Sequence, residues 1–388
     1  MNEKRLGQQI SIFKNILGQY HHEIPLARFL SSYFRRNKQM GSKDRKIASR
    51  LIYNYFRLGA GLPNLPIERR LAIAEFLCTT SSDFVALLEP LLLPHIQKNI
   101  EDKMMLLETE YQFKLEQIFP LSHRISPKVN KEKFLQSHFQ PRDLFIRLRS
   151  GHERFVQEVL VKNNIEYKSI GQKTLQLSNG SQLDKIKEIA GYYEVQDLSS
   201  QQIINLLKPN DGESWWDACA ASGGKSLLLK EVNPNIELMV SDSRLSILRN
   251  LDERFDKAGI NSYRKKIIDL TKNTANVIGY ETFDGIIVDA PCSGSGTWGR
   301  APEHLSVFDN DKLMYYQQLQ RDILNTVVKH VKLGKPLIYI TCSVYKLENE
   351  DQVAHLVEKG FQVESMDYFE GSTNGADTLF AARLTIPR

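Results

Sequence analysis

From residue 214 onward, short apolar runs alternate with longer amphipathic stretches. The apolar runs are strand candidates at 214–218, 236–241, 283–289, 336–341, 361–365 and 378–386, and the helix candidates lie near 224–232, 244–258, 311–332 and 347–359. Such alternation is typical of an open, mainly parallel α/β sheet with helices on both of its faces. Sheets of this kind bind ligands at the carboxyl ends of their strands, so the polar residues that follow these runs are candidate site residues.

Two of the apolar runs end in cysteine. Residues 286–292 end in Cys292, and residues 337–342 end in Cys342. Both runs are expected to be buried parallel strands, whose carboxyl ends lie at one edge of the sheet. A free cysteine is usually a small buried hydrophobic residue. Two of them at equivalent strand ends, one following Asp289 closely, indicate reactive thiols instead.

Length and composition set the outer bounds. A chain of 388 residues predicts two or three domains. Since no run of about 18 apolar residues occurs and the first residues lack a signal-peptide core, we expect a cytoplasmic protein without a membrane segment. The cysteines at 78, 219, 292 and 342 lack the close spacing of a zinc site or a disulfide framework. We therefore expect reduced thiols and no metal, with Cys78 in a helical core.

The amino-terminal segment, residues 1–120, is expected to be a helical domain with a basic surface. Residues 1–60 contain 12 Lys or Arg and three Asp or Glu, a net charge of +9, which leaves −4 for the rest of a chain whose total is +5. A basic module joined to a slightly acidic body is typical of a protein that binds a polyanion. The alternative is a solvated basic helix face. Aromatic residues at 53, 55 and 56 could stack on bases, although their helical spacing favours packing in a core.

Residues 125–205 form a different region, for which we predict a small α+β module. Residues 144–149 alternate like a strand, 155–160 have helical spacing, and 174–177 are again strand-like before a turn at Asn179 and Gly180. The third domain, residues 206–388, then holds the alternating strands and helices.

A small-residue turn follows the first strand of this third domain. Residues 215–226 read as an apolar strand, the turn Cys219–Gly224 and a helix start at Lys225, which suits close approach of a ligand to backbone N–H groups. A phosphate-binding P-loop would need glycine at position 219, where this chain has cysteine. The glycine spacing of a dinucleotide-binding turn is absent as well, so neither of these two motifs is present. Asp242, Asp269 and Asp289 end three of the following strands, and carboxylates there can accept hydrogen bonds from a ribose or an adenine amino group.

These segments together resemble the RsmB/Nop/Sun family of RNA cytosine-5 methyltransferases. The resemblance is carried by residues 217–226, by Asp-Ala-Pro-Cys-Ser-Gly-Ser-Gly at 289–296, by Thr-Cys-Ser at 341–343, by Glu-Asn-Glu at 348–350, and by the segments 195–201 and 375–382. It covers residues 140–388 well. It implies a class I methyltransferase fold that uses S-adenosylmethionine. The basic front segment resembles, less specifically, a NusB-like RNA-binding domain, and the middle module would be RRM-like.

The resemblance also implies how the cofactor would be held. The turn would wrap the methionine part of the cofactor, Asp242 would bind its ribose, and Asp269 would bind its adenine end. Asp289 is also implied as a cofactor-binding residue. The residues of the turn are Cys219, Ala220, Ala221, Ser222, Gly223, Gly224 and Lys225. Two positions depart from the family pattern. Ser222 stands where the family usually has proline, which is expected to loosen the turn and weaken cofactor binding. Ile247 stands where an arginine is frequent.

Methylation at carbon 5 of cytosine sets the chemical requirements. Because carbon 5 is a poor nucleophile, a thiolate must first add to carbon 6, and a base and a group at ring nitrogen 3 must assist. By similarity to DNA cytosine methyltransferases, the nucleophile would be Cys292, the cysteine that follows proline. The RNA family assigns attack to the Thr-Cys-Ser cysteine, here Cys342, with Cys292 releasing the adduct. Asp289 would bind the edge of the base. Lys225 would contact the base or the cofactor; the alternative is that Lys225 is only a surface lysine of a helix.

The sequence therefore predicts an RNA cytosine-5 methyltransferase acting on an unpaired or flipped-out cytosine, with rRNA favoured over tRNA as substrate. The competing prediction is a non-catalytic RNA-binding or ribosome-assembly factor that kept the fold. An amino-group methyltransferase would need an Asn-Pro-Pro-Tyr-like turn in place of Asp-Ala-Pro-Cys.

Overall fold

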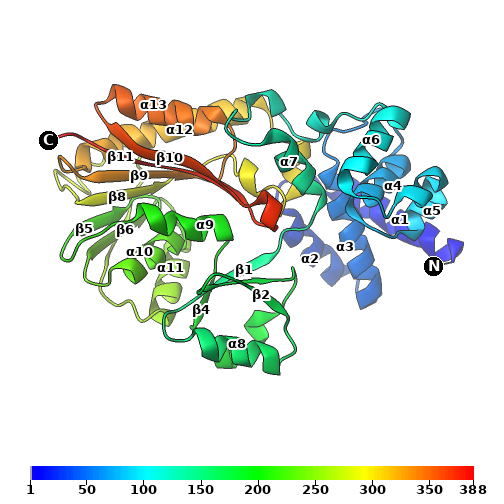
Figure 1. Ribbon diagram of the computed structural model, residues 1–388, viewed down its shortest axis with the longest axis horizontal. Helices are drawn as coiled ribbons and strands as arrows, with labels where there is room; N and C mark the ends of the chain where they lie inside the picture. Colours follow the sequence, from blue (N-terminus) through cyan, green and yellow to red (C-terminus); the bar gives the residue numbers. More distant parts are fainter. Residues whose placement is uncertain (1) are drawn as a thin grey trace. The chain divides into compact units, whose positions relative to one another are not determined.

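In the computed structural model, the carboxyl-terminal half of the chain is built on a seven-stranded sheet (Figure 1). The structure describes residues 2–388, and for Thr373 it describes the backbone alone. The strands are β5 (Ser214–Asp217), β6 (Glu237–Asp242), β7 (Arg264–Ile267), β8 (Gly285–Asp289), β9 (Pro336–Thr341), β10 (Gln362–Glu370) and β11 (Thr378–Thr385). Their order across the sheet is β10-β11-β9-β8-β5-β6-β7.

The sheet is parallel from β7 to β9, and β11 is antiparallel to both of its neighbours. The chain leaves β5 toward β6 and β7 on one side and later toward β8 and β9 on the other. The order therefore reverses between β5 and β8, and in open α/β sheets ligands bind at the carboxyl end of such a switch point. This architecture confirms the predicted class I methyltransferase fold.

Helices cover both faces of the sheet. Helices α10 (Gly224–Val232) and α11 (Leu245–Lys257) lie on one face, and α12 (Asn310–Val327) and α13 (Glu350–Glu358) lie on the other (Figure 1). On the α10 and α11 side, leucines of both helices pack on strand residues that have no exposed surface, among them Val240, Ile287 and Ile338. Burial on two faces explains why the strands read as continuous apolar runs.

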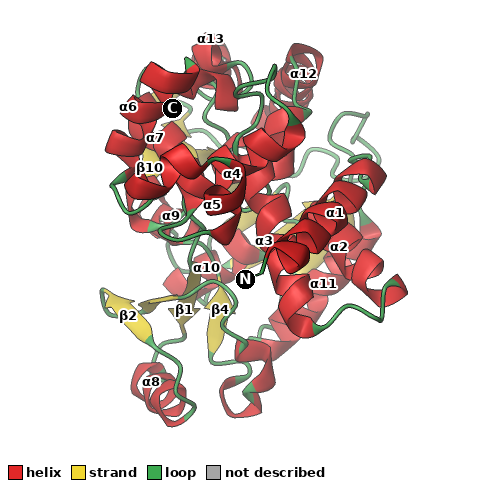
Figure 2. Ribbon diagram, turned by 90° about the vertical axis from the view of Figure 1, so that its right-hand side faces the viewer, coloured by secondary structure: helices red, strands yellow, loops and turns green. Residues whose placement is uncertain are grey.

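A separate four-stranded antiparallel sheet forms the middle of the chain. Its elements are β1 (Leu144–Leu148), α8 (Glu153–Lys162), β2 (Tyr167–Ile170), β3 (Thr174–Leu177) and β4 (Tyr193–Val195), followed by α9 (Leu198–Gln202). The strand order is β2-β3-β1-β4, and Figure 2 shows α8 on one side of this sheet. Val156 and Leu160 of α8 pack on Ile146 and Leu175. The module is thus an α+β unit in which short 3-10 turns precede β4.

The first part of the chain is helical. Its helices are α1 (Glu3–Gln19), α2 (Leu26–Arg36), α3 (Ser42–Arg57), α4 (Ile67–Cys78), α5 (Asp83–Leu88), α6 (Ile100–Tyr111) and α7 (Lys131–Gln136). Tyr55 and Phe56 lie in the core of this bundle beside Phe13, so these aromatic side chains pack rather than stand free for base stacking. None of the described helices is long and apolar enough to cross a lipid bilayer.

Contacts divide the chain into two units. One unit comprises residues up to 123 with 130–141 and 298–310; the other comprises 124–129, 142–297 and 311–388. The segment 298–310 leaves the sheet after the Cys292 turn and belongs to the helical unit. There the Leu26 N–H, at the start of α2, donates to the Glu303 carboxylate at 3.0 Å. This bond caps a helix whose N-cap residue, Pro25, supplies no capping side chain.

Close packing between β5 and β8 makes Gly285 a sensitive position. A Cβ added to Gly285 would lie 2.4–2.5 Å from ring atoms of Trp215. We predict that Gly285→Ala lowers the free energy of unfolding by about 1–3 kcal/mol, the usual range for overpacking. Urea unfolding followed by tryptophan fluorescence measures this. Gly18→Ala, on the open surface of α1, is the matched control, and equal stability of the two variants would contradict the packing argument.

Candidate active site

The two cysteines meet at the carboxyl edge of the sheet. Because β8 and β9 are parallel neighbours with Asp289 opposite Ile340, the turns that follow them lie side by side. The Sγ atoms of Cys292 and Cys342 are 3.3 Å apart. The Gly296 N–H donates to the Cys342 carbonyl oxygen at 2.9 Å, which joins the two turns. Thiols that are 50 residues apart in the sequence are therefore in direct contact.

An ion pair stands at the same edge. Lys225, in the first turn of α10, places its Nζ 3.0 Å from an oxygen of Asp289 and donates to the Ser200 hydroxyl at 2.9 Å. The Lys225 side chain is 10% exposed, whereas that of Asp289 is 34% exposed. The alternative of a surface lysine is thus excluded, and Asp289 keeps an accessible side. The sequence analysis did not single out Ser200.

The turn between β5 and α10 has the backbone shape that small residues permit. Ala221 has φ +46° and Gly223 has φ +84°, both in the left-handed region. A Cβ on Gly223 would lie 2.8 Å from the Phe255 ring and 3.0 Å from Leu251. The glycine therefore allows the turn to pack on α11. Helix α10 begins directly after the turn, so its first N–H groups are candidate donors for a ligand.

Ser222 is bound on both of its oxygen atoms. One nitrogen of the Arg254 guanidinium, on α11, donates to the Ser222 carbonyl and to its hydroxyl, each at 2.9 Å. Another nitrogen of Arg254 donates to Glu194 of β4 at 2.8 Å. These bonds restrain the turn where the family pattern has proline, so the expected loosening has a compensation that the sequence did not reveal.

Two of the strand-end aspartates close local turns. Asp242 accepts the N–H groups of Ala221 at 3.2 Å and Arg244 at 2.9 Å, and also pairs with the Arg244 guanidinium. Asp269 accepts from the N–H and hydroxyl of Thr271 and pairs with Lys272, contacts that lower its pKa. Asp242 is next to the glycine turn, whereas Asp269 follows the edge strand β7, so the predicted cofactor residues are spread along the edge from β8 to β7.

A raised pKa keeps three of the four cysteines protonated, two of them at this edge and one in the helical unit. The hydrogen bond with Cys342 and then burial raise the pKa of Cys292 well above its usual value. Burial, followed by the charge of Asp217, does the same for Cys219, which contributes to the site as part of the turn and not as a nucleophile. Burial raises the pKa of Cys78 to about 12, as expected for a core thiol.

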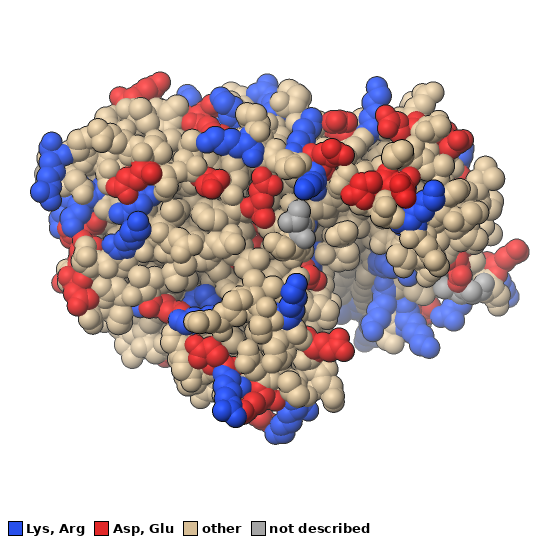
Figure 3. Space-filling model, in the orientation of Figure 1, with Lys and Arg blue, Asp and Glu red and all other residues tan. Residues whose placement is uncertain are grey.

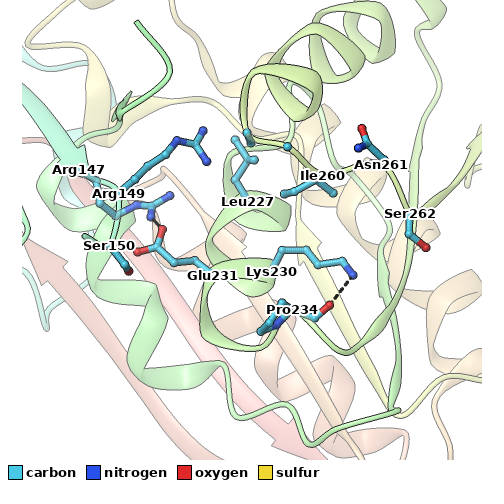
Figure 4. Close-up of a pocket in the computed structure, with 12 residues that line it drawn as sticks. Arg147, Arg149, Ser150, Leu227, Lys230, Glu231, Pro234, Ile260, Asn261 and Ser262 are labelled. Carbon is cyan, nitrogen blue, oxygen red and sulfur yellow. Dashed lines mark hydrogen bonds and ion pairs between the residues drawn. The ribbon is translucent and has the colours of Figure 1, made fainter. Parts of the chain in front are cut away.

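A cavity of about 400 Å³ lies elsewhere, toward the other end of α10 (Figure 4). Its lining includes Pro234, which precedes β6, and Ser262, which precedes β7, so it opens near the amino ends of the strands. The arginines there are engaged: Arg147 contacts Glu231 and Arg149 contacts Glu194. This cavity is separate from the thiol edge.

The residues at the thiol edge fit the cofactor that the fold implies. Carboxylates at the ends of β6, β7 and β8 supply acceptors, and the narrow turn before α10 supplies N–H donors to a ligand that lies across the switch point. The fold is that of a class I methyltransferase, and the predicted site residues lie at the edge where this fold binds its cofactor.

Residues 204–386 match the model of the family described as 16S rRNA methyltransferase RsmB/F, so this part of the chain is similar to that family. The family match confirms S-adenosylmethionine as the expected cofactor. The ribosomal RNA small subunit methyltransferase B of Klebsiella pneumoniae is 34% identical over 164 residues, or 42% of this chain and 38% of that protein. The protein of that name from Shewanella oneidensis is 36% identical over 169 residues, or 43% and 38%. The chain thus matches about two fifths of each relative's length.

Solved structures show the same fold. The crystal structure of PH0851 superposes with a TM-score of 0.72 at 21% identity and covers 96% of this chain and 97% of that one. The structure of NSun6 from Pyrococcus horikoshii with SFG has a TM-score of 0.61 at 16% identity and covers 69% and 97%. At these identities the likeness concerns the fold.

Asp217, which the sequence analysis left out of the site, should make stability depend on pH. It has no exposed surface, accepts from the Ser226 hydroxyl at 2.6 Å, and burial raises its pKa to about 7. The folded state then holds a proton that the unfolded state loses near pH 4, so stability falls as the pH rises from about 4 to about 7.

We predict that Asp217→Asn flattens this slope, because asparagine keeps the acceptor and does not titrate. Urea unfolding between pH 4.5 and 8 measures it. Asp269→Asn is the control, since the pKa of Asp269 is lowered and its removal should leave the slope in this window in place. An unchanged slope in Asp217→Asn would contradict the assignment.

Proposed function

We propose that the protein is an S-adenosylmethionine-dependent RNA methyltransferase that modifies carbon 5 of a cytosine, with ribosomal RNA as substrate. The observation that carries the proposal is the contact between the Cys292 and Cys342 thiols at the edge where Asp289 and Lys225 form their ion pair. The match of residues 204–386 to the model of a family of 16S rRNA methyltransferases supports both the reaction class and the kind of RNA.

Cys342 is the proposed nucleophile. Its thiolate adds to carbon 6 of the cytosine, and the electron pair released into the ring makes carbon 5 nucleophilic. S-adenosylmethionine, when bound, supplies the electrophilic methyl group. Once carbon 5 carries the methyl group, a base or a water molecule takes the proton from carbon 5, and the electron pair of that C–H bond restores the ring double bond. The bond between Cys342 and carbon 6 breaks, and its electron pair returns to sulfur as the thiolate.

Cys292 is proposed to assist this release. Its raised pKa keeps it a thiol near neutral pH, and at 3.3 Å it is close enough to donate a hydrogen bond to the Cys342 sulfur. A thiol in this place can stabilise the neighbouring thiolate both before attack and as it leaves the ring. Asp289, held by Lys225, is proposed to bind the edge of the base.

The helical unit offers a surface for the RNA backbone. We define the basic strip as six exposed Lys and Arg side chains of α2, α3 and the loop between them, namely Arg28, Arg35, Arg36, Lys38, Lys43 and Lys46. Figure 3 shows Lys and Arg gathered on this part of the helical unit. Phosphate contacts of this kind supply sequence-independent affinity that falls with salt. The target cytosine must be unpaired or flipped out to reach a thiol at a sheet edge.

The test is methylation of purified RNA. The protein is incubated with S-adenosylmethionine and either protein-free 16S rRNA or bulk tRNA, and bisulfite sequencing then locates 5-methylcytosine. We expect one or a few modified cytosines in 16S rRNA. Modification confined to tRNA would show that tRNA, and not ribosomal RNA, is the substrate. If no cytosine is modified in any RNA, including that of assembled small subunits, the proposal is overturned in favour of a non-catalytic RNA-binding protein.

The two thiols should respond differently to substitution. We predict that Cys342→Ala neither methylates RNA nor forms a covalent complex with it, since attack on carbon 6 is lost. Cys292→Ala should accumulate a covalent protein–RNA complex, because release is slowed. Denaturing gels and methyl transfer measure both, and Cys78→Ala is the control thiol. The reverse pattern would exchange the two roles.

Arg254 should matter for cofactor affinity because it restrains the turn. We predict that Arg254→Ala weakens binding of S-adenosylmethionine by about tenfold and Ser222→Ala by less, since the second change leaves the bond to the Ser222 carbonyl; a lost charged hydrogen bond costs about 1.5–3 kcal/mol. Isothermal titration calorimetry measures both. Arg249→Ala, elsewhere on α11, is the control. Unchanged affinity in Arg254→Ala would show that the turn is rigid without it.

A further inference from the structure

Glu348 is a buried carboxylate behind the two cysteine turns, and the proposed reaction does not use it. It ends the 3-10 turn Lys346–Glu348, just before α13, and has no exposed surface. Burial raises the pKa of Glu348. A buried carboxylate is costly unless hydrogen-bond donors surround it, so its partners indicate why it is there.

Those partners come from both cysteine turns. The N–H of Ser293 donates to Oε1 at 2.8 Å, and Gln320 donates to the same oxygen at 3.1 Å. The hydroxyls of Ser293 and Ser343 both donate to Oε2. Ser293 follows Cys292 and Ser343 follows Cys342. One carboxylate oxygen therefore binds the residue next to each thiol.

We infer that Glu348 is a positioning residue that holds the two thiols in contact, because it ties the turn behind each cysteine to one buried carboxylate. The role of this contact in methyl transfer rests on the proposed function. The contact itself is a property of the two thiols and can be measured without RNA or cofactor.

The charge of Glu348 adds a second effect on the same pair. Four donated hydrogen bonds favour its ionised form, and its charge contributes to the raised pKa of Cys292, after the hydrogen bond with Cys342 and burial. The other titratable groups that sense this carboxylate are Tyr316 of α12, Tyr339 of β9 and Tyr345, whose raised pKa values keep them neutral near pH 7. Glu348 thus favours a protonated Cys292 beside Cys342.

Glu350 provides a matched control within the same Glu-Asn-Glu motif. Its carboxylate accepts from the hydroxyls of Ser126 and Tyr368, neither of which belongs to a cysteine turn. Glu348→Gln and Glu350→Gln remove the same charge and keep nearly the same shape. Thermal unfolding of both variants checks that each is folded.

The first measurement is capture of phenylarsine oxide, a trivalent arsenical that bridges two thiols held close together. We predict that the wild type and Glu350→Gln bind it equally, whereas Glu348→Gln binds it about tenfold more weakly. Cys342→Ala, which lacks one of the pair, sets the background. Ser293→Ala and Ser343→Ala, which each remove one donor, should fall between the wild type and Glu348→Gln.

The second measurement is the rate at which iodoacetamide alkylates Cys292 at pH 8, followed by peptide mass spectrometry. Loss of the buried charge should lower the pKa of Cys292 and speed alkylation about threefold to tenfold in Glu348→Gln, with no change in Glu350→Gln. If Glu348 only stabilised the fold, a folded Glu348→Gln variant would not show this faster alkylation. If Glu348→Gln matches Glu350→Gln in both measurements, the inference is overturned. Absence of RNA methylation by the wild type would instead overturn the proposed function and leave both thiol measurements valid.

Discussion

The parallel pairing of β8 with β9 is the constraint on which the site depends. Every residue of β9 is buried, and every residue of β8 except Asp289 at its carboxyl end, so packing on both faces of the sheet fixes the register of the two strands. With Asp289 opposite Ile340, the turns that follow begin at the same level. That register is why Cys292 and Cys342 meet at 3.3 Å. A shift of two residues in either strand would move its turn by more than 6 Å and separate the thiols.

Polar groups at this edge stabilise one another because an apolar sheet lies directly beneath them. Lys225 is nearly buried, and Asp289 and Ser200 both take hydrogen bonds from it. Glu348 is fully buried, and four hydrogen bonds surround it. Networks of this kind are costly when one member is missing, which explains how a site built on loops can be rigid. The charge of Glu348 in this network also contributes to the raised pKa of Cys292.

Much of the fold could be predicted because its signals are local. The six strand candidates from residue 214 onward agree with β5, β6 and β8 to β11, and the helix candidates agree with α10 to α13, to within a few residues at most ends, since apolar runs and helical spacing are readable in short windows. The edge strand β7 is missing from these candidates because its exposed residues do not form an apolar run. Strand β10 runs on to Glu370, five residues beyond its candidate, because its pairing with β11 extends it. The segment 298–310 was not foreseen as part of the helical unit, because its contacts, such as Leu26 with Glu303, join residues far apart in the sequence.

The sequence by itself determined the open α/β sheet, the turn that precedes α10, and the identity of the chemical groups, since residue types and their spacing are sufficient for these. Only the tertiary structure decided that the two thiols touch, that Arg254 restrains Ser222, and that Glu348 joins both cysteine turns. These are pair distances between distant parts of the chain, and they depend on strand register and core packing. Burial also follows from packing, which is why the acid–base character of Asp217, Cys219 and Cys292 became visible only in three dimensions.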